Sequence, residues 1–269
     1  MTFRAVLATS LDEAALEAAL GSTADAILLA INNPSPRADD ARRQALGALA
    51  RIHDAGKAAA VTVNHPRTQL LRDDLDAIVA PALDAVFLPH ASGPQDARDA
   101  AVLLREFEYG CGMEPGAVAL FPIIDTARGL LRAPEIAVAS PRTAGLVFDS
   151  AAYARDILAR DEAQGPRLAY ARGAVVAAAR AAGGLPLVVA SHLEARELAH
   201  YGFAGLVFSD PAGASAAAGA LTPTAAVLEW AAAAIAAYDA ARAEGAWVAR
   251  LGTTFIDAHT ARQARRLLE

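Results

Sequence analysis

Cysteine and lysine are scarce in this 269-residue chain, which has one of each. Because Cys111 is the only cysteine, no disulfide can form within the chain, and a reducing cytoplasm is its natural setting. Lys57 directly precedes a strand-like segment and therefore falls at the amino-terminal end of that strand. A Schiff-base aldolase needs a desolvated lysine inside its active site, so we expect no Schiff-base chemistry here.

The chain also lacks a long apolar run and an excess of positive charge. No segment approaches about 18 consecutive strongly apolar residues, and much of the 55% hydrophobic content is alanine, a helix former. The first residues show no charged region followed by an apolar stretch and a cleavage site, so we expect no secretory signal. The net charge of −6 argues against general nucleic-acid binding. We therefore expect neither a membrane nor a nucleic-acid partner.

Eight short β-rich segments alternate with longer segments rich in alanine, leucine and arginine. We predict strands at Arg4–Ala8, Asp25–Ile31, Ala58–Asn64, Asp84–Pro89, Ala117–Ile124, Ala144–Phe148, Pro186–Val189 and Gly205–Phe208. Helical patterns include Leu11–Leu20, Asp39–Ala55, Asp96–Phe107 and Leu168–Ala182. Such alternation predicts right-handed βαβ units and a parallel sheet. Eight units in about 220 residues predict a TIM (β/α)8 barrel. A doubly wound open sheet is the alternative fold.

A different pattern begins at residue 222. Thr222-Pro223-Thr224 precedes a helical segment from Ala225 to about Glu244, and a threonine is a suitable helix cap. Thr254-Phe255-Ile256-Asp257 then leads into a basic helix near the end of the chain. No linker rich in glycine or serine separates these residues from the barrel. We predict a barrel at 1–221 and a helical extension or lid at 222–269, both in the same domain unit.

Several motifs resemble, in order and spacing, those of one family. They are Asp25-Ala26-Ile27-Leu28-Leu29, Val63-Asn64, Val86-Phe87-Leu88-Pro89, Ile123-Ile124-Asp125-Thr126-Ala127-Arg128-Gly129-Leu130, Gly145-Leu146-Val147-Phe148, Gly202-Phe203-Ala204-Gly205 and Phe255-Ile256-Asp257. Over essentially its whole length the chain resembles the citrate lyase β-subunit-like family of the HpcH/HpaI aldolase superfamily. The resemblance implies a TIM barrel that assembles as a trimer or hexamer. It also implies Mg²⁺-dependent making or breaking of a carbon–carbon bond next to a CoA thioester.

The resemblance also assigns site residues. Asp125 stands at the metal-binding glutamate of the family, and Asp257 is the acid of a tail that closes over a neighbouring subunit's site. These two are the candidate catalytic residues, and Asp125 and Asp149 are the candidate Mg²⁺ ligands. The candidate substrate-binding residues are Asn32, Asn33, Thr62, Asn64, His90 and Asp210.

Several of these positions differ from the family pattern. Asn32 and Asn33 replace acids, Thr62 replaces an arginine, His90 replaces a lysine, Asp210 replaces a histidine, and Ala152 replaces the second metal-binding acid. Mg²⁺ demands near-octahedral oxygen coordination, usually with one or two carboxylates, and arginine is the usual bidentate clamp for a carboxylate. Two functions stay open: a lyase altered in substrate or metal, and a noncatalytic member that binds a ligand or a partner subunit.

A third hypothesis rests on polar residues that follow predicted strand ends. These residues are His65, His90, Asp125, Asp149, His192 and Asp210. In a barrel they would gather at the C-terminal face, where they can form a transition-metal site or an acid–base pair. The alternative is that they cap helices and face water, since Asp149-Ser150 and Ser191-His192 both precede helical segments. A serine triad is disfavoured because no G-x-S-x-G motif is present.

Overall fold

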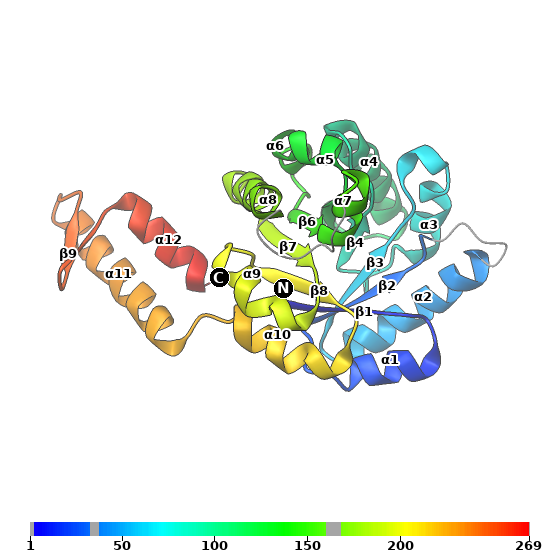
Figure 1. Ribbon diagram of the computed structural model, residues 1–269, viewed down its shortest axis with the longest axis horizontal. Helices are drawn as coiled ribbons and strands as arrows, with labels where there is room; N and C mark the ends of the chain where they lie inside the picture. The colour runs from blue at the N-terminus through cyan, green and yellow to red at the C-terminus, as the bar shows by residue number, and fades with distance from the viewer. Residues whose placement is uncertain (1–2, 33–37, 160–167, 269) are drawn as a thin grey trace. The chain divides into compact units, whose positions relative to one another are not determined.

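The structure is a computed structural model that describes residues 3–32, 38–159 and 168–268. The chain forms two compact units, Met1–Leu221 and Thr222–Glu269. The first unit is a closed barrel of eight strands, each parallel to its neighbours (Figure 1). This arrangement confirms the predicted TIM barrel, and the alternative of an open sheet is wrong.

All eight predicted strands are present, with bounds within two residues of those expected. They are β1 (Ala5–Thr9), β2 (Ala26–Ala30), β3 (Ala58–Thr62), β4 (Ala85–Leu88), β5 (Ala119–Ile124), β6 (Gly145–Asp149), β7 (Leu185–Val189) and β8 (Gly205–Phe208). The barrel closes where β1 pairs with β8, with Val6 opposite Val207. All the carboxyl ends therefore meet at one rim, which we call the mouth.

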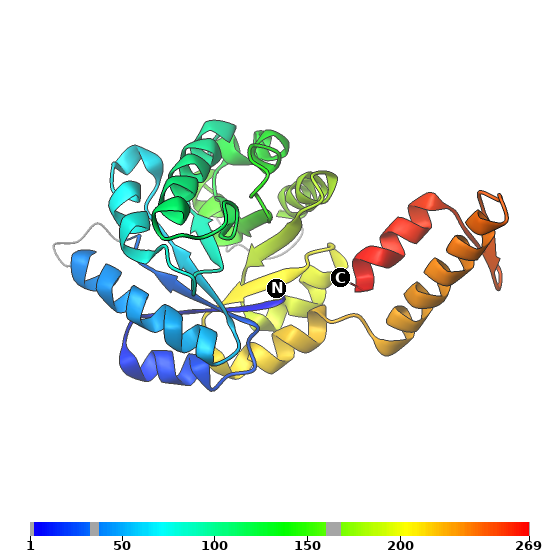
Figure 2. The same cartoon turned by 180° about the vertical axis from the view of Figure 1, so that it is seen from behind.

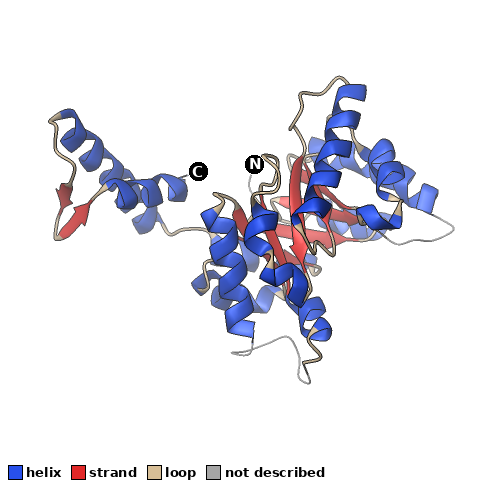
Figure 3. Cartoon of the chain, turned by 90° about the horizontal axis from the view of Figure 1, so that it is seen from above, coloured by secondary structure: helices blue, strands red, loops and turns tan. Residues whose placement is uncertain are grey.

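Helices cover the outside of the strands (Figures 2 and 3). They are α1 (Glu13–Leu20), α2 (Ala38–Asp54), α3 (Leu71–Ile78), α4 (Pro94–Gly110), α5 (Ala127–Leu131), α6 (Ala133–Ala137), α7 (Ser150–Asp156), α8 (Ala169–Ala181), α9 (Ala195–His200) and α10 (Ala214–Leu221). Short 3-10 helices also lie at the mouth: η1 (Pro66–Thr68), η3 (His192–Glu194) and η4 (Pro211–Gly213).

The barrel interior is filled by side chains and is not a channel. Phe121 lies at its centre, with ring centroids 5.0 Å from Phe3 and 5.1 Å from Phe87. Strand β3, which pairs with β4, contributes only the small residues Ala58 and Ala60 to this interior cluster among the described residues. These small side chains leave room for the aromatic rings. A second, larger apolar layer lies between the strands and the helices.

Polar side chains secure the amino-terminal ends of the strands. The carboxylate of Asp25 accepts a hydrogen bond from Ala5 N, and that of Asp84 accepts one from Ala59 N. Lys57 Nζ donates to the carbonyls of Ser22 and Ala24, so it lies where the sequence predicts, at the end opposite the mouth. Lys57 therefore has a structural role that is remote from the rim.

The second unit contains α11 (Ala225–Ala243), a hairpin of β9 (Ala249–Leu251) and β10 (Thr254–Ile256), and α12 (Ala258–Leu268). The predicted helices are confirmed, and the Thr224 side chain caps α11 by accepting from Val227 N. The hairpin was not predicted, because its strands are only three residues long. Small residues such as Ala231, Ala261 and Ala264 form the buried contact of this unit.

One stretch among the described residues, Pro211–Ala243, is long and apolar enough by length and composition to cross a membrane. A single stretch of this kind is weak evidence for a membrane span. It consists of η4, α10 and α11, which are separate elements interrupted at residues 222–224. Pro223 explains the break, because proline and the residue before it disfavour helix continuation.

Candidate functional site

Histidines and aspartates at the mouth form pairs. Among the described residues, no three His, Cys, Asp or Glu side chains converge as a metal site would require. The described residues therefore do not support the hypothesis of a single transition-metal cluster. The pairs are His90–Asp125 at 2.7 Å, His65–Asp96 at 3.5 Å and His192–Asp210 at 3.6 Å.

The pair of His90 and Asp125 has the tightest geometry. Asp125 follows β5 and its side chain is only 5% exposed, whereas His90 follows β4 and its side chain is 69% exposed. Asp125 Oδ2 accepts from the His90 Nδ1–H at 2.7 Å and from the His90 backbone N at 3.0 Å. A carboxylate on Nδ1 fixes the tautomer, so the accessible Nε2 has a free lone pair. This is the arrangement of a general base.

The backbone at this pair is unusual. His90 has a φ of 57°, in the left-handed region that costs a non-glycine residue on the order of 1–3 kcal/mol. The next residue, Ala91, lies so close to α5 that a β-carbon at Gly129 would come within 2.5 Å of the Ala91 carbonyl oxygen. Gly129 is thus required for α5 to pack against the loop that carries His90. The surrounding structure holds His90 in place despite the strain.

The Asp125 side chain is buried, and one of its two carboxylate oxygens lacks a hydrogen bond within the described part of the chain. Its Oδ1 has no hydrogen-bond partner among the described residues. Burial raises the pKa of Asp125 above its usual value, and the nearby Asp149 adds to the rise, whereas His90 opposes it. A buried polar atom without a partner is uncommon in a native protein and often marks a catalytic role or an absent ligand.

A second pair, His65 and Asp96, lies at the next strand. His65 follows β3 and caps η1, since its Nδ1 accepts from Arg67 N. Its Nε2 is buried without a hydrogen bond, because 3.5 Å to Asp96 Oδ1 is too long. Burial lowers the pKa of His65, and Arg67 and His90 reinforce this against the pull of Asp96.

Asp96 is strongly engaged, although its residue type alone did not mark it. It belongs to the first turn of α4 and accepts hydrogen bonds from Ser92 N, Gly93 N and the Arg67 guanidinium. Burial alone would raise the pKa of Asp96, but the Ser92 amide, His65 and Arg67 together lower it. The sequence signal that could identify Asp96 is its place at the third position of a helix that begins with Gly93-Pro94.

The third pair borders a cavity of about 490 Å³ at the mouth. The cavity is lined by Ala8, Val189, Ala190, Ser191, His192, Val207, Phe208, Ser209 and Asp210. Gly213 lies directly against the His192 ring, where any β-carbon would overlap it. Ser191 and Asp210 cap η3 and η4, so the predicted capping role of Ser191 is confirmed.

Asn64, a predicted substrate ligand, is held within the protein. Its backbone N and side-chain Nδ2 both donate to Asp74 Oδ2, at 2.7 and 2.8 Å. Arg42 binds the other oxygen of Asp74 through two nitrogens. Of the other predicted ligands, Thr62 is the last residue of β3 and is buried, and Asn32 is half-buried after β2. Asn33 lies outside the described residues.

The described residues do not fit an octahedral Mg²⁺ site. Oδ2 of Asp125 is occupied by His90, and Ala152 offers no ligand where a second acid is expected. Asp149 caps α7 by accepting from Ala152 N, which confirms the predicted cap. Asp156, four residues after Ala152, accepts through one oxygen from Ala127 N at the start of α5. Mg²⁺ needs oxygen ligands in near-ideal geometry, and Asp125 Oδ1 alone is not enough.

Asp257 belongs to the second unit. Its Oδ1 accepts from Thr260 N at 2.8 Å and from the Thr260 hydroxyl at 2.9 Å. These hydrogen bonds lower the pKa of Asp257. The carboxylate therefore has a local partner in the first turn of α12.

A closed (β/α)8 barrel with paired acids and bases at the carboxyl ends of its strands defines a TIM-barrel protein, a class in which functional sites lie at this rim. The family model of HpcH/HpaI aldolase/citrate lyase matches residues 5–207. The chain belongs to this family, which confirms the resemblance found in the sequence.

The relatives carry two kinds of name. The citrate lyase subunit beta of Escherichia coli K12 is 34% identical over 145 residues, which cover 54% of this chain and 48% of that protein. The match thus spans about half the length of that curated relative. A (3S)-malyl-CoA thioesterase of Cereibacter sphaeroides is 28% identical over 249 residues, covering 88% of this chain and 83% of that one.

The fold is also that of a solved relative. A structure of the citrate lyase β protein of Mycobacterium tuberculosis, in complex with magnesium, acetoacetate and coenzyme A, superposes with a TM-score of 0.62. The alignment has 22% sequence identity and covers 99% of this chain and 97% of that chain. Identity at this level supports the shared fold, which agrees with the barrel described above.

Proposed function

We propose that the mouth of this barrel carries out lyase-type chemistry on a CoA thioester or small oxo acid, with His90 as the proton acceptor. The observation that carries the proposal is the 2.7 Å contact between His90 Nδ1 and buried Asp125, which leaves Nε2 outside this contact on a side chain that is 69% exposed. Asp125 is the positioning residue: it fixes the ring and stabilises the imidazolium that forms. A base of this kind accelerates proton transfer by about 10²–10⁴-fold.

In the cleavage of a β-hydroxy acyl thioester, His90 Nε2 takes the hydroxyl proton. The carbon–carbon bond breaks as the new carbonyl forms, and its electron pair passes to the thioester as an enolate. The enolate then regains a proton at carbon. No step is assigned to Mg²⁺, because the described residues do not fit that ion. Magnesium and coenzyme A belong to the named M. tuberculosis complex, and here coenzyme A is proposed as part of the substrate.

The test is turnover of malyl-CoA by the purified chain in the presence of a chelator. Glyoxylate release reports cleavage, and free thiol reports hydrolysis. His90→Asn keeps a residue that tolerates a positive φ but removes the base, so we expect a loss of about 10²–10⁴-fold in kcat. His200→Asn, at an exposed residue of α9, is the matched control and keeps full activity. Equal rates in both variants would exclude His90 as the base.

A second candidate function is noncatalytic ligand binding. It is favoured by Thr62, at the position where the resemblance places a substrate-clamping arginine, and by the engagement of Asn64 with Asp74. If this second function is correct, calorimetry should show saturable binding of malyl-CoA, and neither glyoxylate nor free thiol should be released. Turnover above the uncatalysed rate would rule it out.

We further propose a homo-oligomer, trimer or hexamer, in which the second unit with Asp257 approaches a neighbouring site. A cytoplasmic location fits the single cysteine. Sedimentation analysis of the full chain and of a chain truncated after Leu221 tests the assembly, since only the full chain should oligomerise.

A further inference from the structure

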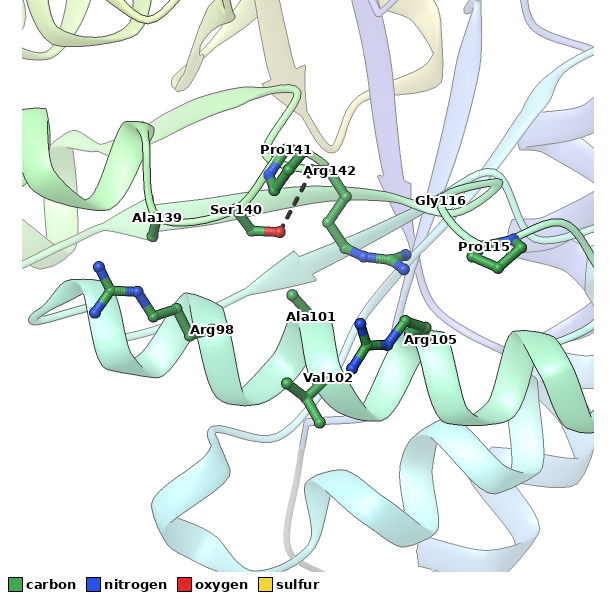
Figure 4. Close-up of a pocket in the computed structure, with 10 residues that line it drawn as sticks. All are labelled: Arg98, Ala101, Val102, Arg105, Pro115, Gly116, Ala139, Ser140, Pro141 and Arg142. Atoms are coloured by element: carbon green, nitrogen blue, oxygen red, sulfur yellow. Dashed lines mark hydrogen bonds between the residues drawn. The ribbon is translucent and has the colours of Figure 1, made fainter.

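A pocket of about 490 Å³ lies on the outer wall of the barrel, between α4 and the loops that precede β5 and β6 (Figure 4). Its walls are one side of α4, the turn at Pro115 and Gly116 before β5, and the loop at 139–142 before β6. Small-molecule sites commonly have volumes of about 300–1,000 Å³. The pocket thus has the size of a ligand site and is separate from the His90 region.

The walls are fixed by one buried carboxylate. Glu108 is fully buried on α4 and binds the Arg142 guanidinium through both oxygens at 2.8 Å. The same carboxylate accepts from Gly116 N and Val118 N, each at 2.9 Å. One side chain therefore joins the helix to both loops. A pocket held in this way exists before any ligand arrives.

Two arginines on α4 line this pocket without charge partners. Arg98 and Arg105 extend from α4 on the side of the 139–142 loop (Figure 4). Neither guanidinium forms an ion pair or hydrogen bond with any described residue. The acids of α4 are all engaged elsewhere, since Asp96 binds Arg67, Asp99 accepts from Gln95, Glu106 binds Arg72 and Glu108 binds Arg142. Arg142, the third arginine of the lining, is paired with Glu108, and none of the described residues that line the pocket is an acid, so Arg98 and Arg105 have no counter-charge there.

The rest of the lining is mostly apolar. Ala101 and Val102 lie between the two arginines along the helix, and Pro115, Ala139 and Pro141 face them. Val102 is 53% exposed, so its side chain offers apolar surface to a ligand. An apolar floor flanked by two cations is complementary to a molecule with acidic ends and an apolar middle.

The geometry points to a binding site for a small organic dianion whose two acidic groups are separated by an apolar segment. Arg98 and Arg105 are seven residues apart, which is about 10 Å along a helix. One carboxylate binds each guanidinium in a bidentate manner, and the chain between them lies on Ala101 and Val102. This site does not depend on the chemistry proposed for the mouth.

Equilibrium dialysis of the full chain with radiolabelled suberate, an unbranched eight-carbon dicarboxylate, tests the site. We expect saturable binding that weakens at high salt and falls about tenfold or more in Arg98→Gln/Arg105→Gln, since each charged pair contributes through bidentate hydrogen bonds. Octanoate, with one carboxylate, should bind more weakly than suberate, and 1,8-octanediol should not bind.

Two further variants complete the test. Arg43→Gln/Arg196→Gln removes the same charge from exposed positions outside the pocket and should leave suberate binding unchanged. Val102→Glu adds a negative charge to the exposed floor and should abolish binding without affecting folding. The proposal is overturned if the Arg98/Arg105 variant binds suberate like the wild type, if octanediol binds equally well, or if no suberate binds up to about 10 mM.

Discussion

At the amino-terminal end of the barrel, the buried Glu108 carboxylate is saturated with partners, whereas at the mouth several buried polar atoms have none among the described residues. Asp84 accepts from the chain at Ala59, and Glu108 satisfies four donors with two oxygens. At the mouth, Asp125 Oδ1, His65 Nε2 and Ser150 Oγ lack partners among the described residues, while at the other end only Thr143 Oγ1 does. Saturated groups stabilise the fold, and unsatisfied groups are available to a ligand.

The largest expected effect is a loss of stability on substitution of Glu108, at the amino-terminal end of the barrel. Glu108→Gln leaves the buried Arg142 guanidinium without its counter-charge, and we expect a loss of about 3–5 kcal/mol in the free energy of unfolding. Urea denaturation measures this loss. Replacing both partners by leucine should recover only part of it, because the apolar pair leaves no unpaired charge but deprives the Gly116 and Val118 amides of their acceptor. A single variant as stable as the wild type would contradict the comparison.

Protonation of Glu108 should also lower the free energy of unfolding at acidic pH. Burial alone would raise the pKa of Glu108, but Arg142 and the amides of Gly116 and Val118 lower it below the usual 4.5. The unfolded chain therefore binds this proton more readily than the folded protein. The stabilisation is complete above about pH 4.5 and is lost as the pH falls through the folded value. Glu108→Gln should remove this part of the acid dependence, as measured by urea midpoints between pH 6 and pH 3.

At the mouth, the expected change in stability has the opposite sign. Because burial raises the pKa of Asp125 above 3.8, the folded protein binds this proton more readily than the unfolded chain. The ionised carboxylate thus weakens folding at neutral pH, and this cost disappears below the unfolded value. Asp125→Asn should raise the unfolding free energy by about 0.5–2 kcal/mol at pH 7 while kcat falls. A less stable variant would mean that Asp125 is retained for the fold.

His65 should show a smaller effect. Burial lowers its pKa from 6.5, so below that pH the unfolded chain takes up the proton first. The contribution of His65 to stability is complete above about pH 6.5 and is lost as the pH falls toward the pKa of the folded protein. His65→Gln should flatten the thermal unfolding profile between pH 7 and pH 5. An unchanged slope would show that His65 titrates equally in both states.

The smallest expected effect is that of substituting Asp125 on the binding of a divalent metal ion. Mn²⁺ substitutes for Mg²⁺ at oxygen sites, and its electron paramagnetic resonance signal reports binding directly. We expect no submillimolar binding to the metal-stripped protein and no difference in Asp125→Ala, because Oδ2 is held by His90. Submillimolar binding that the variant loses would show that Asp125 still anchors a metal.

The barrel could be predicted because a short sequence pattern marks each of its strands. Each strand is a short apolar run that ends at a polar residue, as at Leu88-Pro89-His90 or Ile124-Asp125, so the rim residues could be identified together with the fold. The pairing of those residues could not be predicted. His90 contacts Asp125 from a backbone with a positive φ, and Asp96 is buried in the first turn of α4 although aspartate is usually exposed.

Asn64 illustrates the same limit. Its position after β3 correctly places it at the rim, but its partners Asp74 and Arg42 come from two different helices. A contact between side chains of three separate elements leaves no periodic signal along the chain. The distinction between an amide that holds the fold and one that binds a substrate therefore depends on the three-dimensional structure.

Side-chain contacts hold helix α4 near both of its ends. Near its start Asp96 contacts His65 and Arg67 at the mouth, and near its end Glu108 holds Arg142 at the opposite end of the barrel. Its 17 residues span about 25 Å, and Arg98 and Arg105 lie between these contacts. The same helix therefore forms one wall of the arginine pocket and, through Asp96, one neighbour of His65 at the mouth.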